Sequence, residues 1–301
     1  MRVGVVDIGT NTVRLLLADV EPGGALADVE RRSVVVGLGT NVDRTGRFDD
    51  DAITRATTAL SGFGRLLDAN DVRARRAVAT SASRDAADAG VFFDTVEGLL
   101  GVRPQIIAGE VEAALSFAGA VWGLPGPSPT LVIDPGGGST ELVSGGTEPE
   151  HATSVDIGSV RLTERHLPDR PASEDQMLAA RHHVADLFGA VDVPDVVRVV
   201  GVGGTFTTLA AIVLGLDSYD RDRVHGASVD LESADRLVAQ LSRLTVAQTA
   251  AIPSMDPARA PVLLGGAVVV AEAIRWSGHS SAEVSESDLL DAMVRELAVG
   301  R

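Results

Sequence analysis

Short apolar runs separated by polar turns dominate the first twenty residues. Val3 to Val6 and Val13 to Leu17 are β-branched or aliphatic, and residues 7–12 between them are Asp-Ile-Gly-Thr-Asn-Thr. Two such runs around a glycine-containing turn are typical of a β-hairpin. The pattern therefore predicts two paired strands at the start of the chain.

The apolar spacing then changes to that of helices alternating with short strands. Three aspartates at 49–51 precede apolar residues at helical spacing from Ile53 to Leu67, and acids in a first turn complement the helix dipole. The same pattern predicts, in chain order, a strand over 73–80, a helix over 91–100, a strand over 104–108 and a helix over 110–122.

Residues 123–129, Gly-Leu-Pro-Gly-Pro-Ser-Pro, form the densest Pro and Gly cluster of the chain. Such a cluster favours a domain boundary, so we predict an N-terminal domain over 1–124 and a C-terminal domain over 125–301. Within the second domain we predict a strand over 130–134 before a Gly-rich turn and a second strand, helices over 160–167 and 174–188, a strand over 196–200, and mostly helix from 232 onward, interrupted by a strand over 282–285.

The two predicted hairpins resemble each other. In each, an Asp closes an apolar strand (Asp7 and Asp134), a Gly follows two residues later, and hydroxyl residues open the next strand. An internal repeat of this kind indicates two related α/β domains, each contributing a turn to a common cleft.

Composition narrows the possible functions. The 301 residues are 45% hydrophobic, which suits about two globular domains, and the absence of Cys excludes disulfides, thiolate metal sites and a cysteine nucleophile. A formal charge of −16 argues against a nucleic-acid-binding protein. All 26 Lys+Arg positions are Arg, which suits oxyanion binding but is better explained by codon supply.

Neither end of the chain suggests membrane insertion. Asp7 interrupts the apolar segment that a signal peptide would need, and the apolar tract 267–271 is far shorter than the roughly 20 residues of a membrane-spanning helix. We therefore expect a soluble cytoplasmic protein.

Three Gly- and hydroxyl-rich turns each follow an apolar strand. Consecutive backbone amides with Ser or Thr hydroxyls form concavities that bind phosphate oxygens, and a helix N-terminus adds to this at the third turn. Any one of these turns could instead be an ordinary hairpin turn. The candidate phosphate-binding residues are Gly9, Thr10, Asn11 and Thr12 in the first turn, Gly136, Gly137, Gly138, Ser139 and Thr140 in the second, and Gly203, Gly204 and Thr205 in the third.

Charged residues beside these turns suggest phosphate and metal chemistry. Asp134 and Glu141 flank the second turn, and carboxylates with substrate phosphates and water are the ligands that Mg²⁺ prefers. These acids could also simply cap turns. Glu112 lies in the first turn of a predicted helix, where the helix dipole alone would explain it.

Several cationic side chains could contact phosphate. Arg84 follows a predicted buried strand, and Arg14 and Arg161 follow turns, although an Arg in a loop is usually only solvated. His225 could donate to phosphate, but a single His is more often a satisfied structural residue.

Seven segments together resemble one family. They are DIGTNTVRLLLADV (7–20), VATSASRDA (78–86), AGEVEAALSFAGA (108–120), VIDPGGGSTELV (132–143), DIGSVRLTE (156–164), GVGGTFTTLAA (201–211) and VHGASV (224–229). They span nearly the whole chain in one order. The sequence is similar to the exopolyphosphatase and guanosine pentaphosphate phosphohydrolase family in its short form.

The resemblance implies two ribonuclease H-like domains of the actin, Hsp70 and sugar-kinase superfamily, with an active site between them. It implies that Glu112 is the base that activates water, and that Asp7, residues 10–12, Arg84, Asp134 and residues 136–141 take the phosphate and magnesium roles. The implied substrate is inorganic polyphosphate or guanosine pentaphosphate, and the usual assembly is a homodimer.

Three positions depart from the family pattern. Pro135 replaces an aliphatic residue and removes one backbone donor from the second turn, while Val111 and Asp88 stand where Glu and Asn are common. Besides polyphosphate hydrolysis, three functions stay open: guanosine pentaphosphate hydrolysis, a small-molecule kinase using the third turn for nucleotide, and a non-catalytic sensor of polyphosphate or guanosine tetraphosphate.

The sequence ends after the second predicted domain, without the helical extension of longer family members. We therefore expect a preference for short polymers and low processivity, because an extended anion channel would be missing. Phosphate release from polyphosphates of increasing defined length measures this, and faster turnover on very long chains would contradict it.

Overall fold

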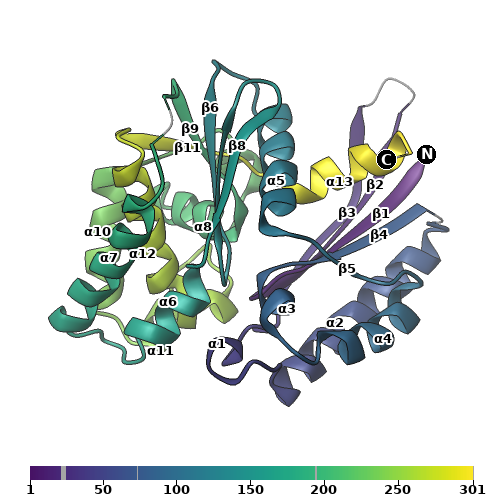
Figure 1. Ribbon diagram of the computed structural model, residues 1–301, viewed down its shortest axis with the longest axis horizontal. Coiled ribbons are helices and arrows are strands. Elements are labelled where there is room, and N and C mark those ends of the chain that lie inside the picture. Colours follow the sequence, from purple (N-terminus) through teal and green to yellow (C-terminus); the bar gives the residue numbers. More distant parts are fainter. Residues whose placement is uncertain (22–24, 73, 194, 301) are drawn as a thin grey trace. The chain divides into compact units, whose positions relative to one another are not determined.

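The computed structural model describes residues 1–21, 25–72, 74–193 and 195–300, which divide into two compact units (Figure 1). One unit consists of Met1–Leu115 with Leu289–Arg301, and the other of Ser116–Asp288. This division differs from the predicted domains 1–124 and 125–301 in two ways. The break falls within a helix, α5 (Gly109–Gly123), so the Pro- and Gly-rich cluster lies inside the second unit, and the last helix belongs to the first.

The first unit is built on a five-stranded sheet of order β3-β2-β1-β4-β5. The predicted hairpin is confirmed, because β1 pairs antiparallel with β2 and parallel with β4. The strand β3, the longest of this sheet, was not predicted. Arg73, at the start of the strand predicted over 73–80, lies outside the described residues. The strands are β1 (Arg2–Ile8), β2 (Thr12–Val20), β3 (Leu26–Val35), β4 (Ala74–Ala79) and β5 (Gln105–Ile106).

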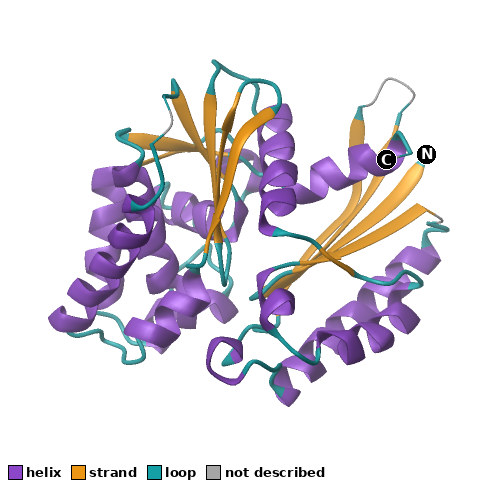
Figure 2. Ribbon diagram, viewed as in Figure 1, coloured by secondary structure: helices purple, strands orange, loops and turns teal. Residues whose placement is uncertain are grey.

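Helices cover both faces of this sheet (Figure 2). Val3 and Val5 pack in one cluster with α13, whereas Val6 and Ile8 pack in another with α2 and α4, as the two-residue period of a strand requires. The helices are α1 (Val42–Thr45), α2 (Asp50–Ala69), α3 (Ser81–Asp85), α4 (Ala89–Leu100), the first part of α5, and α13 (Leu289–Ala298).

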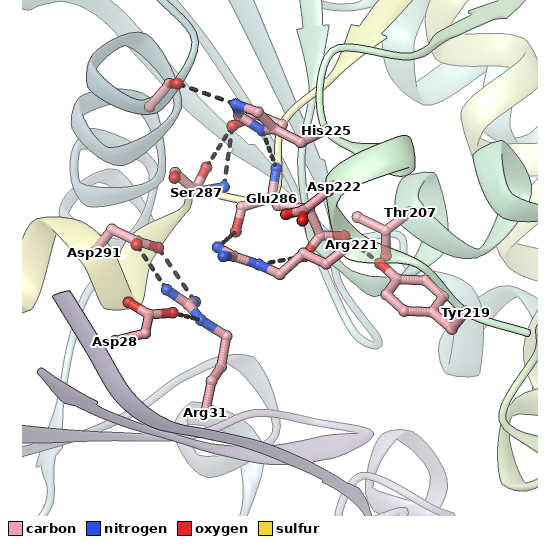
Figure 3. Close-up of polar contacts among 12 residues, drawn as sticks. Asp28, Arg31, Thr207, Tyr219, Arg221, Asp222, His225, Glu286, Ser287 and Asp291 are labelled. Carbon is pink, nitrogen blue, oxygen red and sulfur yellow. Dashed lines mark hydrogen bonds and ion pairs between the residues drawn. The ribbon is translucent and has the colours of Figure 1, made fainter. Parts of the chain in front are cut away.

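A buried ion pair fastens α13 to the sheet (Figure 3). Arg31 of β3 donates to both oxygens of Asp291, at 2.7 and 3.3 Å, and to Asp28 at 2.8 Å. Burial lowers the pKa of Arg31, but the two aspartates outweigh burial and raise it above its usual value. Because Asp291 is only 3% exposed, losing Arg31 would remove the guanidinium that binds both oxygens of a buried carboxylate, which is destabilising.

The second unit repeats the architecture of the first. Its sheet has the order β10-β11-β9-β6-β7-β8, so β8-β7-β6-β9-β11 reproduces the order β3-β2-β1-β4-β5 of the other sheet. The predicted fold class, two ribonuclease H-like α/β domains, is confirmed. The strands are β6 (Thr130–Pro135), β7 (Thr140–Gly145), β8 (Pro149–Val155), β9 (Arg198–Gly201), β10 (Ser228–Asp230) and β11 (Ser281–Val284).

The helix α12, drawn beside α7 and α10 in Figure 1, contributes buried residues from Ala260 to Ile274 to the second unit's core. Together with the preceding 3₁₀ turn it forms a 20-residue apolar stretch, Pro257–Trp276, which is long enough to cross a membrane and longer than the tract noted in the sequence. However, 72% of the most apolar part of this stretch is buried inside the structure, as in a core helix. The helices are α6 (Ser159–His166), α7 (Glu174–Gly189), α8 (Gly203–Val213), α9 (Arg221–Val224), α10 (Leu231–Ser242), α11 (Val246–Ala250), the 3₁₀ helix η1 (Pro257–Arg259) and α12 (Ala260–Trp276).

Two glycines of α2 provide a test of this packing. A Cβ atom on Gly64 would lie 1.9 Å from the Leu99 carbonyl oxygen of α4, whereas one on Gly62 would meet nothing closer than 3.8 Å. Gly64→Ala should therefore destabilise the protein by about 1–3 kcal/mol through overpacking. Gly62→Ala should stabilise it by about 0.5–1 kcal/mol through helix propensity. Urea unfolding midpoints measure both, and equal effects would contradict the packing of α2 against α4.

Candidate active site

The first glycine turn joins β1 to β2. The Gly9 amide donates to the Thr12 carbonyl oxygen at 3.0 Å and closes the turn. Asp7 and Arg14 are cross-strand partners, and Arg14 Nε and Nη2 lie 2.9 and 2.8 Å from Asp7 Oδ2. Because Asp7 is only 4% exposed, these two contacts to a single oxygen give the buried carboxylate a compensating charge.

The tip of this turn is fastened to two other segments. The Thr10 hydroxyl accepts a hydrogen bond from the Ala82 amide at 3.1 Å, at the start of α3. The Asn11 carbonyl oxygen accepts from the Val36 and Gly37 amides at 2.9 Å each. The turn and the segment that carries Arg84 are therefore held together within the first unit.

Arg84 and Glu112 form an ion pair. Arg84 Nη1 donates to Glu112 Oε2 at 2.9 Å and to the Ile107 carbonyl oxygen at 3.0 Å. The two side chains are 23% and 13% exposed, so the pair is shielded from solvent but not sealed from it. The first unit thus brings together the predicted base and the predicted phosphate-binding arginine.

The second turn joins β6 to β7 and closes as the first does, with the Gly136 amide donating to the Ser139 carbonyl oxygen at 2.9 Å. Pairing of β6 with β7 continues through Pro135, opposite Thr140, while pairing of β6 with β9 ends at Ile133. The proline therefore leaves the hairpin intact.

Asp134 and Glu141, the predicted magnesium ligands, are direct cross-strand partners. Side chains at such positions lie on one face of a sheet with Cβ atoms about 4.5–5.5 Å apart, and like charges there repel. Asp134 is partly exposed, whereas Glu141 is 1% exposed. Two carboxylates so placed fit a magnesium site, because Mg²⁺ typically takes one or two protein carboxylates and fills its other positions with phosphates and water.

Three serine hydroxyls donate to these two carboxylates. Ser139 and Ser154 donate to Glu141 Oε1 at 2.7 and 2.8 Å, and Ser116 of α5 donates to Asp134 Oδ2 at 2.6 Å. Ser116 and Ser154 were not among the sequence candidates. These two serines can be recognised as site residues only once the strand register and the packing of α5 are known, because neither belongs to a glycine turn.

The second turn also anchors the helix that follows β8. The Gly136 carbonyl oxygen accepts from the Ser159 amide at 3.0 Å, and the Gly137 carbonyl oxygen accepts from the Val160 amide at 2.8 Å. The Thr140 hydroxyl donates to the Ile157 carbonyl oxygen at 2.5 Å. The predicted hydroxyls Ser139 and Thr140 therefore donate to protein oxygens in this structure.

The third turn lies against the second. Gly203 has φ +79°, a conformation that favours glycine, and a Cβ atom there would lie 2.6 Å from Asp134 Oδ1. The Thr205 hydroxyl donates to the Pro135 carbonyl oxygen at 3.3 Å. A Cβ atom on Gly204 would meet the Arg259 guanidinium at 2.2 Å, so Arg259, which the sequence did not single out, also borders this turn.

His225 and Arg161 have structural partners. His225 Nδ1 accepts from the Glu286 amide at 3.1 Å, so Nε2 carries the proton and donates to the Gly123 carbonyl oxygen at 3.1 Å (Figure 3). Arg161 lies 3.8 Å from Asp156. The interpretation of His225 as a satisfied structural residue is therefore supported over that of a phosphate donor.

Within the described ranges, no group of three or more His, Asp or Glu side chains is arranged to hold a metal ion. The pair formed by Asp134 and Glu141 stays the candidate predicted from the sequence for a divalent cation. It fits a cation that completes its coordination with substrate, rather than a closed structural site.

Known proteins are similar to this chain over nearly its whole length. The family model described as "Ppx/GppA phosphatase family" matches residues 16–294. Exopolyphosphatase 2 of Mycobacterium tuberculosis is 40% identical over 99% of this chain and 98% of its own length. Two crystal structures are similar to the chain throughout. One is of an exopolyphosphatase from Cytophaga hutchinsonii, with 26% identity and a TM-score of 0.91, covering 100% of this chain and 98% of that one. The other is of the Aquifex aeolicus Ppx/GppA family member, with 29% identity and a TM-score of 0.84, covering 99% of this chain and 98% of that one. The chain therefore belongs to the Ppx/GppA phosphatase family.

Proposed function

We propose that this protein is an exopolyphosphatase that removes the terminal phosphoryl group of short inorganic polyphosphate and releases orthophosphate. The observation that carries the proposal is the ion pair between Arg84 and Glu112, which joins an oxyanion-binding group to a carboxylate base at 2.9 Å. Family membership and the name of the relative from Mycobacterium tuberculosis support the same activity.

Glu112 is the general base in this proposal. Its carboxylate accepts a proton as a water oxygen attacks the terminal phosphorus, the bond from phosphorus to the bridging oxygen breaks, and the electron pair stays on the shortened polymer. Arg84 serves two groups, because a guanidinium has five donors and can bind a phosphate oxygen while it holds a carboxylate. Arg84 therefore orients the base relative to the phosphoryl group.

The remaining residues bind and orient the polyanion. Asp134 and Glu141 would hold Mg²⁺, which supplies charge neutralisation at the phosphates when it is bound. The glycine turns would offer backbone amides to phosphate oxygens. Arg14, which holds Asp7, would maintain the first turn in the conformation that binds phosphate.

Glu112→Gln tests the assignment of the base. Phosphate release from polyphosphate of defined length in Mg²⁺ should fall by about 10²–10⁴-fold, while polyphosphate binding is retained. Glu110→Gln is the matched control, since Glu110 is an exposed acid on the same turn of α5 and should leave the rate unchanged.

Guanosine pentaphosphate and ATP with sugars or acetate are assayed beside polyphosphate, and chelation of Mg²⁺ should abolish release. A wild-type rate in the Glu112→Gln protein would exclude Glu112 as base. Phosphate release from guanosine pentaphosphate but not from polyphosphate would show that the substrate assignment is wrong.

Gly203→Ala tests the second unit's part in the proposal. The new methyl group would displace the Asp134 carboxylate, so we expect phosphate release to fall more than tenfold. Gly215→Ala is the control, because Gly215 also has positive φ (+63°) but no atom within 4 Å of its Cβ position. Both variants should lose about 1–2 kcal/mol of stability through the left-handed backbone. Equal phosphate release by the two variants would contradict a role for Asp134.

A further inference from the structure

Ser116 is an unusual residue for its place in the fold. It is fully buried in α5, between Leu115 and Phe117, which are themselves buried. A buried hydroxyl costs free energy unless it is hydrogen-bonded, and serine has only moderate helix propensity. The position is therefore suited to Ser only because of the bond that its hydroxyl makes.

That bond is to a charged group of the candidate site. Ser116 Oγ lies 2.6 Å from Asp134 Oδ2, a length typical of a hydroxyl that donates to an ionised carboxylate. On its other side the same carboxylate meets the third turn, where Gly203 approaches Asp134 Oδ1 so closely that a Cβ atom would lie 2.6 Å from it. The carboxylate is thus confined between a hydroxyl and a glycine backbone.

Glu141, the cross-strand partner, is held in a similar way by two serine hydroxyls. Side chains that donate to metal ligands fix their orientation, and losing one typically weakens metal affinity 10- to 100-fold. Ser116 has the place of such a donor for Asp134.

We propose that Ser116 is a positioning residue whose hydroxyl holds the Asp134 carboxylate in the orientation that coordinates the divalent cation. The inference rests on the proposed function, because that function assigns the cation to Asp134. It adds a residue that lies one helical turn after Glu112 in α5 and belongs to no glycine turn.

The test is the affinity of the full-length protein for Mn²⁺ alone, measured by isothermal titration calorimetry without polyphosphate. Ser116→Ala should weaken Mn²⁺ binding about tenfold or more and raise the Mg²⁺ concentration needed for half-maximal phosphate release. In an Asp134→Asn background the same substitution should cause no further loss. Ser277→Ala is the matched control, because Ser277 is also buried but its hydroxyl donates to the Ile274 carbonyl oxygen, and it should bind Mn²⁺ as the wild type does.

The outcomes separate this inference from the proposed function. A folded Ser116→Ala protein with wild-type Mn²⁺ affinity overturns the role of Ser116 and leaves the exopolyphosphatase proposal standing. A wild-type protein that releases no phosphate from polyphosphate in Mg²⁺ overturns the proposed function itself. If Ser116→Ala does not fold, Ser116→Cys replaces the hydroxyl with a weaker donor of similar size, and wild-type Mn²⁺ affinity in that variant equally overturns the inference.

Discussion

Two carboxylates that repel each other lie on neighbouring strands of the second unit, and the contacts around them must offset this repulsion. Asp134 and Glu141 face each other across β6 and β7, and both are withdrawn from bulk solvent to different degrees. Such a pair costs free energy unless donors or a cation compensate it. The three serine hydroxyls supply part of that compensation, and the proposed divalent cation would supply the rest.

In the first unit, the corresponding cross-strand pair consists of an acid and a base instead of two acids. Arg14 follows Asp7 at the spacing at which Glu141 follows Asp134, and each pair is a cross-strand pair beside a glycine turn. One hairpin therefore neutralises its aspartate internally, whereas the other carries a second negative charge. The repeated hairpins thus differ in charge, and the proposed cation site lies at the second of them.

Local pattern predicted most of the elements and the repeat, because buried strands and amphipathic helices have clear periods. It missed β3 and β8, which are edge strands with largely exposed faces and thus lack the alternation that marks half-buried strands. The unit boundary was misplaced because Pro and Gly clusters mark turns as well as linkers. The motifs identified Asp134 and Glu141, but Ser116 and Ser154 depend on helix packing and strand register, which no local motif encodes.

The membership of α13 in the first unit has a consequence for biosynthesis. Residues 289–298 pack on strands that are synthesised much earlier, and Asp291 supplies the partner of Arg31. The first unit's core therefore cannot be completed until residues 289–298 have been synthesised, whereas the second unit is contiguous and can fold earlier. Until then, Val3, Val5 and Leu16 of the amino-terminal sheet lack their contacts with α13.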